Sequence, residues 1–222
     1  MTTSAIRMPD AAVPAHVGSP APQAIPTTIV IDSPIADPGP LGLAGFALTT
    51  FILSLFNANL IGNPKLEAVV LPVALVYGGI VQLLAGMWEF KKNNTFGAVA
   101  FCSFGAFWLS FVGYVKYIAP TLPPADAHTA TGIFLVSWTI FTAYMLLASI
   151  KTNAVLTAVF GALLVTFVFL TFGAFNTNAS LTHVGGYFGL LTAALAWYLS
   201  AAVVTNATWG RTVLPVFPSR KS

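Results

Sequence analysis

The polar side chains that could act on a solute lie inside long apolar stretches, and they are hydroxyls and amides instead of paired acids or metal ligands. Any one of these groups can join two membrane helices through a hydrogen bond. Together they suit a path for a small polar solute that does not have to be matched by a full charge. The groups are Thr49, Thr50, Ser54, Asn57, Gln82, Ser103, Ser110 and Thr166.

Residue patterns of catalysis are missing from the sequence. The chain has three isolated histidines and one cysteine, whereas a catalytic metal site needs two or three His, Cys or carboxylate ligands close together. The sequence contains no Gly-Lys-Ser/Thr phosphate loop, Gly-x-Ser-x-Gly elbow or His-Glu-x-x-His motif. We therefore expect a protein that is not an enzyme and that has no cofactor and no metal site.

The elements that must position the polar groups follow from the composition. Hydrophobic residues make up 57% of the chain and charged residues 7%, whereas soluble domains carry about 25% charged residues. Such a chain cannot cover a surface that faces water, so the class is integral membrane. The net charge of +3 is small and scattered, which excludes nucleic acid as a partner.

Apolar segments of about 20 residues follow one another along the chain, each long enough to cross a bilayer as a helix. Barrel strands would alternate apolar and polar residues, and this pattern is absent, so helices remain as the way to pair the backbone in lipid. The sequence predicts an all-α integral membrane protein whose six helices form a pore-containing bundle. The expected spans are 41–61, 68–88, 98–119, 131–150, 155–175 and 182–204.

Three regions and an orientation are predicted. Residues 1–40, rich in Pro, Ala, Ser and Thr, are expected to be a disordered cytoplasmic tail; residues 41–206 form the transport domain, and 207–222 a cytoplasmic C-terminal tail. With six spans, both termini share a side with most of the basic residues, which places them in the cytoplasm and the spans in the plasma membrane. That side holds Arg7, Lys91, Lys92, Lys151, Arg211, Arg220 and Lys221, and the other side holds Lys65 and Lys116.

Several sequence blocks carry a family resemblance. The stretch from Asp37 to Phe46, Asp-Pro-Gly-Pro-Leu-Gly-Leu-Ala-Gly-Phe, is similar to an Asn-Pro-x-Pro-Leu-Gly-Leu signature. Residues 77–97 resemble a block that runs from Tyr-Gly-Gly-x-x-Gln to Gly-Asn-Thr-Phe-Gly, and residues 210–215 resemble a C-terminal Gly-Arg-Thr-Val-Leu-Pro. These blocks are those of the succinate/acetate permease family, the YaaH-type acetate uptake transporters (AceTr family). The entry motif is Asp37, Pro38, Pro40 and Gly42.

The resemblance implies a function and a set of site residues. It implies a homo-hexamer in the lipid bilayer, in which each six-helix protomer has its own pore for acetate and in some members succinate, with protons as possible co-substrates. By position, the constriction residues are Phe46, Phe104 and Leu163. Thr49, Gln82 and Asn57 are the expected substrate-binding residues, and Glu89, Asn94 and Thr95 the expected residues of the cytoplasmic end, where a proton relay through Glu89 stays open.

Two departures from the family pattern, and the absence of fixed cations inside the spans, refine the expected function. Phe104 stands where the family often has Tyr, so we expect a drier gate that is less favourable to dicarboxylates. Asp37 stands where Asn is usual, and a carboxylate at the mouth should repel anions. Because fixed cations are absent inside the spans, acetate should cross most readily as the neutral acid.

Two other functions remain open at this stage. A channel for a small neutral solute, such as urea or ammonia, would need the same hydroxyl and aromatic lining. A membrane scaffold or sensor that transports nothing is the third possibility, and the residues matched to the family's pore argue against it.

Overall fold

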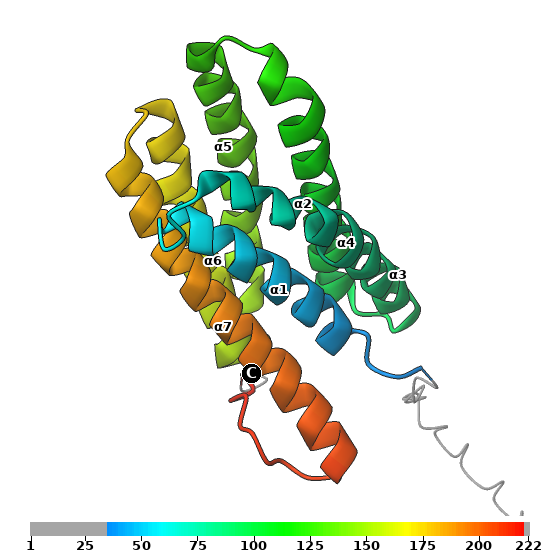
Figure 1. The fold of residues 1–222 in the computed structure, drawn as a ribbon. Helices are drawn as coiled ribbons and strands as arrows, with labels where there is room; N and C mark the ends of the chain where they lie inside the picture. Colours follow the sequence, from blue (N-terminus) through cyan, green and yellow to red (C-terminus); the bar gives the residue numbers. More distant parts are fainter. Residues whose placement is uncertain (1–34, 220–222) are drawn as a thin grey trace, which may run out of the picture. The chain divides into compact units, whose positions relative to one another are not determined.

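The computed structural model describes residues 35–219, and this part of the chain holds six helices that are long and apolar enough to cross a membrane (Figure 1). The predicted six-helix fold is confirmed. The single-element spans are α1 (Gly39–Asn57), α5 (Pro124–Ser149), α6 (Ala154–Phe175) and α7 (Ala179–Trp209). The second span joins η1 (Pro64–Val69), α2 (Val70–Val73), η2 (Ala74–Val81) and α3 (Gln82–Lys91), and the third joins α4 (Thr95–Gly113), η3 (Tyr114–Ile118) and η4 (Ala119–Thr121).

Several helices extend beyond the predicted spans. Helix α5 begins at Pro124, seven residues before the span expected at 131–150, because proline is tolerated in the first helical turn. Helix α7 continues past the expected boundary at residue 206 and ends where Gly210 adopts φ of 63°. Most of the predicted N-terminal tail, residues 1–34, lies outside the described residues, and α1 begins at Gly39 within its last positions.

Asparagine side chains start three of the helices. The side-chain oxygens of Asn94, Asn153 and Asn178 accept hydrogen bonds from backbone N–H groups in the first turns of α4, α6 and α7. These N–H groups have no partner within the helix, so each cap stabilises its helix by about 1 kcal/mol. The loop residues that look like simple turn formers in the sequence thus define where the spans begin.

The second span contains a π-helical segment, η2, which packs between α1 and α4. Gly45 of α1 allows the close approach, because a Cβ there would lie 2.6 Å from the carbonyl oxygen of Tyr77. On the other side, a Cβ on Gly105 of α4 would lie 3.0 Å from the carbonyl oxygen of Gly79. Such π segments often occur at functional sites, and this one holds the second span against both helices that carry the aromatic constriction residues.

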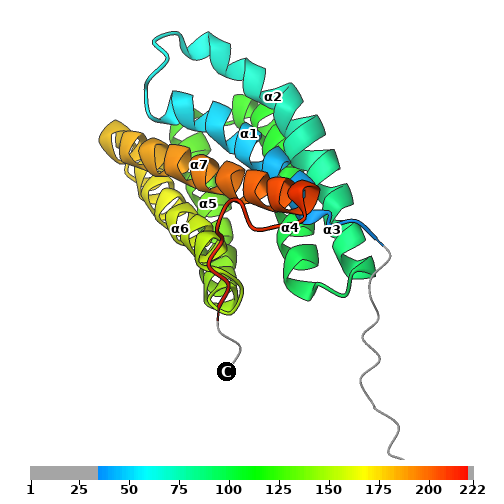
Figure 2. The ribbon, with the colours of Figure 1, turned by 90° about the horizontal axis from the view of Figure 1, so that it is seen from below.

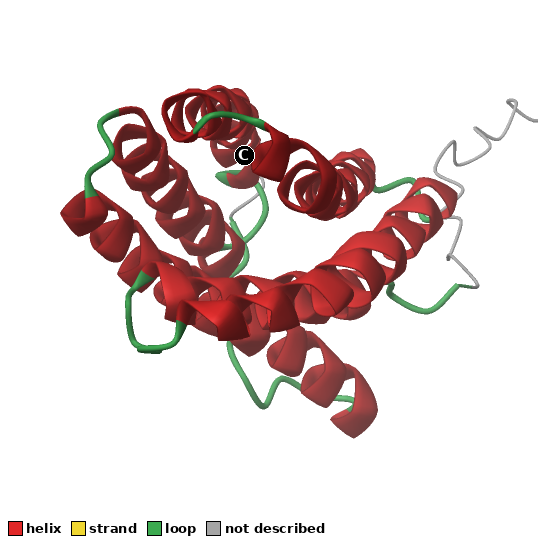
Figure 3. Ribbon diagram, turned by 45° about the horizontal axis from the view of Figure 1, so that its top comes forward, coloured by secondary structure: helices red, strands yellow, loops and turns green. Residues whose placement is uncertain are grey.

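The spans pack side by side around an interior. Helix α1 packs against α7, α7 against α6, and α6 against α5, while α3 packs against α4 (Figure 2). Helices α4 and α5 make few backbone approaches, and aromatic side chains connect them instead. Phe107 and Phe134 stack with ring centroids 5.6 Å apart, and Phe134 stacks on Tyr114 at 5.8 Å. Figure 3 shows that helices make up nearly all of the described residues.

Residues 211–219, which we name the C-terminal strap, return from the end of α7 to the α5–α6 loop (Figure 2). The side chain of Asn206 accepts hydrogen bonds from the N–H groups of Val213 and Leu214 and donates to the Leu214 carbonyl. At the other end, Ala154 N–H donates to the Phe217 carbonyl, and Ser219 N–H donates to the loop at the Thr152 carbonyl. The predicted C-terminal tail is therefore a segment tied to two spans as far as residue 219.

Large apolar side chains cover the outside of the described spans. Ile140 and Leu147 of α5 are 64% and 71% exposed, which would be unfavourable for so many side chains in water. The protein is accordingly a multi-pass membrane protein, whose outer faces contact lipid or another protein.

Candidate functional site

Three of the predicted residues meet inside the bundle. Phe46 of α1, Phe104 of α4 and Leu163 of α6 are each at most 5% exposed, and the rings of Phe46 and Phe104 lie 5.6 Å apart. All three line one cavity. We name this set the gate.

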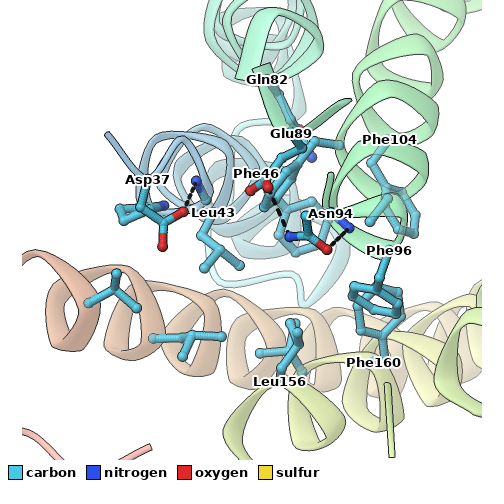
Figure 4. A pocket seen from close by; sticks show the side chains of 18 of the residues that line it. Asp37, Leu43, Phe46, Gln82, Glu89, Asn94, Phe96, Phe104, Leu156 and Phe160 are labelled. Carbon is cyan, nitrogen blue, oxygen red and sulfur yellow. Dashed lines mark hydrogen bonds between the residues drawn. The ribbon is translucent and has the colours of Figure 1, made fainter. Parts of the chain in front are cut away.

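The first cavity, the mouth chamber, extends from the gate to the N-terminus of α1 and has a volume of about 190 Å³ (Figure 4). Asp37, Glu89 and Asn94 line its end away from the gate, and Gln82 is a further polar residue of its lining. Its gate end is aromatic and aliphatic. A solute would therefore pass from polar walls to a dry constriction.

The second cavity, the wide chamber, has a volume of about 730 Å³. Thr50, Asn57, Trp108 and Thr166 are among its lining residues. Leu163 is the one described residue that lines both chambers. The two chambers thus meet at the gate.

Asp37 and Lys92 form an ion pair at the mouth. Lys92 Nζ lies 2.9 Å from Asp37 Oδ1, which also accepts the N–H of Gly39 at 3.0 Å. Because this pair is net neutral, Asp37 repels anions less than the sequence suggested. Glu89 is only 1% exposed, and its Oε2 accepts a hydrogen bond from Asn94 Nδ2 at 2.8 Å (Figure 4).

The three predicted substrate-binding residues do not form one group. Gln82 lines the mouth chamber and Asn57 the wide chamber. Thr49 lines neither, and its hydroxyl donates to the Gly45 carbonyl four residues earlier. Thr95, predicted at the cytoplasmic end, is exposed in the first turn of α4.

The entry motif has structural contacts of its own. The Pro38 carbonyl accepts hydrogen bonds from two N–H groups in the first turn of α1, and the Pro40 carbonyl accepts the Ser200 hydroxyl of α7 at 2.7 Å. Gly42 faces the Phe101 ring, which a Cβ would approach to 2.7 Å. These residues fix α1 against α7 and α4 at the mouth.

Sequence reasoning missed part of the lining. Phe160 lies beside Phe104 with ring centroids 6.1 Å apart, and Asn153 lines the mouth chamber while it caps α6. Helical spacing could have found Phe160, because it precedes Leu163 by three residues on the same helix. Trp138 and Phe141 of α5 also contact Phe104, and no short-range pattern in the sequence reveals a contact between those spans.

Three buried polar atoms have no hydrogen-bond partner among the described residues: Thr50 Oγ1, Gln82 Oε1 and Trp108 Nε1. All three residues line a chamber, Gln82 on the mouth side and the other two on the wide side. A buried polar atom without a partner is unfavourable by about 1–3 kcal/mol. Its occurrence beside a cavity is typical of a place that a solute visits.

Six membrane spans around two chambers that meet at an apolar gate define a membrane transport protein for small solutes. The family to which the chain belongs is the GPR1/FUN34/yaaH family, whose model matches residues 18–220. The predicted resemblance is thereby confirmed.

Several of the relatives have names of transport proteins. The chain is 42% identical over 184 residues to the succinate-acetate/proton symporter SatP of Escherichia coli K12, which covers 82% of this chain and 95% of the relative. It is 42% identical over 176 residues to ammonia transport outward protein 2 of Saccharomyces cerevisiae (77% of this chain and 62% of the relative). A solved structure of the bacterial acetate channel SatP matches with a TM-score of 0.75 at 40% identity and covers 82% of this chain and 99% of that one.

Proposed function

We propose that this protein transports acetate and related short-chain carboxylates across the membrane. The observation that carries the proposal is the gate, an uncharged constriction of Phe46, Phe104 and Leu163 between two chambers that are mostly apolar but each contain polar side chains. Such a path admits a small solute with one apolar and one polar end. The names of the symporter and of the acetate channel among its relatives support the same solute.

The proposal includes an orientation and an assembly. The positive-inside rule supports a cytoplasmic mouth chamber, because Lys91, Lys92, Lys151 and Arg211 lie at the helix ends on that side. We place both termini in the cytoplasm and the spans in the plasma membrane. Because each protomer has its own two chambers, assembly into a hexamer would give a path in every protomer, and the exposed apolar faces offer surfaces for it.

Acetate is expected to pass the gate as the neutral acid. Moving a carboxylate anion out of water between aromatic rings without a countercharge is strongly unfavourable, whereas protonation removes that cost. On the mouth side, the unpartnered Gln82 Oε1 is a hydrogen-bond acceptor, so any group that binds it must carry a donor. The O–H group of acetic acid is such a donor, and acetate has none. Glu89, which lines the same chamber, is a candidate to receive the proton.

Acetate influx into proteoliposomes tests the function. We expect protein-dependent uptake of radiolabelled acetate to rise as the outside pH falls from 7 to 5, since the neutral fraction of an acid with a pKa near 4 to 5 then grows about 50- to 90-fold. Influx into protein-free vesicles is subtracted, because the neutral acid also crosses lipid. Competition by propionate, lactate, succinate and urea defines the solute class. Uptake equal to that of protein-free vesicles would exclude acetate transport, and pH-independent uptake would exclude the neutral acid.

A channel for a neutral solute such as urea or ammonia is the second candidate, and the name of the yeast relative favours it. Both solutes are small and uncharged, and the same hydroxyl and aromatic lining would suit them. Osmotic swelling of proteoliposomes in acetate, in urea and in ammonium separates the candidates. Swelling that is faster than in protein-free vesicles only with urea or ammonium would favour this candidate over acetate transport.

Phe104→Tyr is expected to raise succinate uptake relative to acetate uptake by about tenfold. The new hydroxyl would give a second carboxyl group a hydrogen-bond partner at the narrowest point, and one such bond is equivalent to about 1 kcal/mol or more. Labelled succinate and acetate uptake by the variant measure the ratio. Phe141→Tyr, one contact away from Phe104, is the matched control. An unchanged succinate-to-acetate ratio in Phe104→Tyr contradicts the prediction.

A further inference from the structure

Thr50 and Trp108 occupy equivalent places next to the gate. Each follows a gate phenylalanine by four residues on the same helix, Phe46 on α1 and Phe104 on α4. Four residues are about one helical turn, or about 6 Å along the axis. The phenylalanines line the mouth chamber, whereas Thr50 and Trp108 line the wide chamber. The two residues therefore lie one turn beyond the gate on its wide side.

The Thr50 hydroxyl differs from those of other buried threonines. Thr142, Thr166 and Thr192 each donate a hydrogen bond to the carbonyl four residues earlier in their own helix, at 2.8–2.9 Å. Thr50, which is 6% exposed, makes no such bond and has no partner among the described residues. Its O–H group is thus free to donate to something else.

Trp108 adds a second donor of the same kind. Its side chain is 2% exposed, and Nε1 has no acceptor among the described residues. An indole N–H can only donate, so the missing partner must be an acceptor. Phe107 and Phe111 contact the Trp108 ring, with centroids 4.9 Å and 5.8 Å away, and they make the surroundings of the N–H apolar.

We propose that Thr50 Oγ1 and Trp108 Nε1 form a binding site for a monocarboxylate on the wide side of the gate, in which both donate hydrogen bonds to its carboxylate oxygens. This proposal rests on acetate transport as the proposed function and adds the residues that hold the solute before it crosses. The gate side chains would face the methyl group. Across the gate, the unpartnered Gln82 Oε1 is an acceptor, so the two sides bind opposite forms of the solute: donors bind the anion, and the acceptor binds the protonated acid. The carboxylate takes up the proton from the solution on the wide side before it passes the gate.

Substitutions that remove only the donors test the site. We expect Thr50→Val and Trp108→Phe each to raise the KM for acetate influx from the wide side about tenfold, a change that corresponds to about 1.4 kcal/mol. Thr50→Val should not lower the thermal stability, because it removes a buried polar atom that has no partner. Trp108→Phe also shortens a ring packed against Phe107 and Phe111, so some loss of stability is expected there and its KM is measured below the unfolding temperature. Thr142→Val and Trp197→Phe are matched controls, since neither residue lines a chamber, and they should keep the wild-type KM.

A measurement without transport gives an independent readout. In protein with ¹⁵N-labelled indole in lipid nanodiscs, acetate should move the Trp108 Nε1–H resonance, which is assigned by its absence in Trp108→Phe, and equal concentrations of chloride should not. A Trp108 resonance that does not respond to acetate, or wild-type KM values in both variants, would overturn the site while acetate transport stands. Wild-type protein that takes up no acetate would instead refute the proposed function.

Discussion

Asn94→Ala is expected to lower the free energy of unfolding by about 2–4 kcal/mol, because one side chain serves two buried partners. Its Oδ1 accepts the N–H of Gly97 at 3.1 Å and caps α4, and its Nδ2 donates to Glu89 at 2.8 Å. Loss of the cap is unfavourable by about 1 kcal/mol, and a Glu89 carboxyl oxygen left without its donor by about 1–3 kcal/mol more. The thermal unfolding midpoint of the purified protein in detergent measures the change.

Asn178→Ala is the matched control for this prediction. Asn178 caps α7 through the N–H of Leu181 at 3.1 Å, in an exposed position, and its side chain makes no second bond to a carboxyl group within the described residues. We expect a loss of about 1 kcal/mol there. Equal shifts of the midpoint in the two variants would show that the bond from Asn94 to Glu89 adds nothing. When each variant also carries Glu89→Gln, the difference between the unfolding midpoints of Asn94→Ala and Asn178→Ala should be smaller.

Gly186→Ala is also expected to lower the free energy of unfolding, by about 3 kcal/mol, and for a steric reason. A Cβ at Gly186 of α7 would lie 2.5 Å from the carbonyl carbon of Asn57 and would also collide with the backbone nitrogen of Ala58. Backbone atoms cannot rotate away as a side chain can, so α1 and α7 would have to separate. The expected result is a lower unfolding midpoint and a smaller fraction of protein that survives heating in size-exclusion chromatography.

Gly161→Ala, on α6, is expected to raise the free energy of unfolding instead. A Cβ on Gly161 of α6 meets no atom of the described residues within 4 Å. Alanine then stabilises the helix by about 0.5–1 kcal/mol, because glycine loses more backbone freedom on folding. A loss of stability in Gly161→Ala as large as that in Gly186→Ala would mean that the close contact of α1 with α7 is not the cause.

The sequence predicted the spans well, because a lipid core requires long apolar helices and each one leaves a local signal. The ends were less certain. Pro124 and Gly210 change where α5 and α7 begin and end, and the choice between loop and helix at such positions depends on packing. The π-helical turn around Gly78 also escaped prediction, since its hydrogen-bond register depends on the contact with α1 and α4.

For the candidate site, the family resemblance indicated Phe46, Phe104 and Leu163, and the structure brings them together. Sequence patterns could not show which polar atoms have a hydrogen-bond partner in the structure. Thr49 and Thr50 are neighbours of one residue type, but Thr49 bonds within its helix and Thr50 does not. The pairing of Asp37 with Lys92 likewise joins segments 55 residues apart in the chain, and only the fold reveals that the charge of Asp37 is balanced.

The C-terminal strap has a practical consequence for anyone who labels this protein. Ser219 donates hydrogen bonds to the loop before Asn153, through its backbone N–H to Thr152 and its hydroxyl to Ile150, and Asn153 is part of the mouth chamber wall. A fluorescent protein or purification tag fused directly after residue 219 would disturb these hydrogen bonds and, through them, the wall of the mouth chamber. Reporter fusions should therefore carry a long flexible linker, and transport rates from tagged and cleaved protein should be compared before either is taken as native.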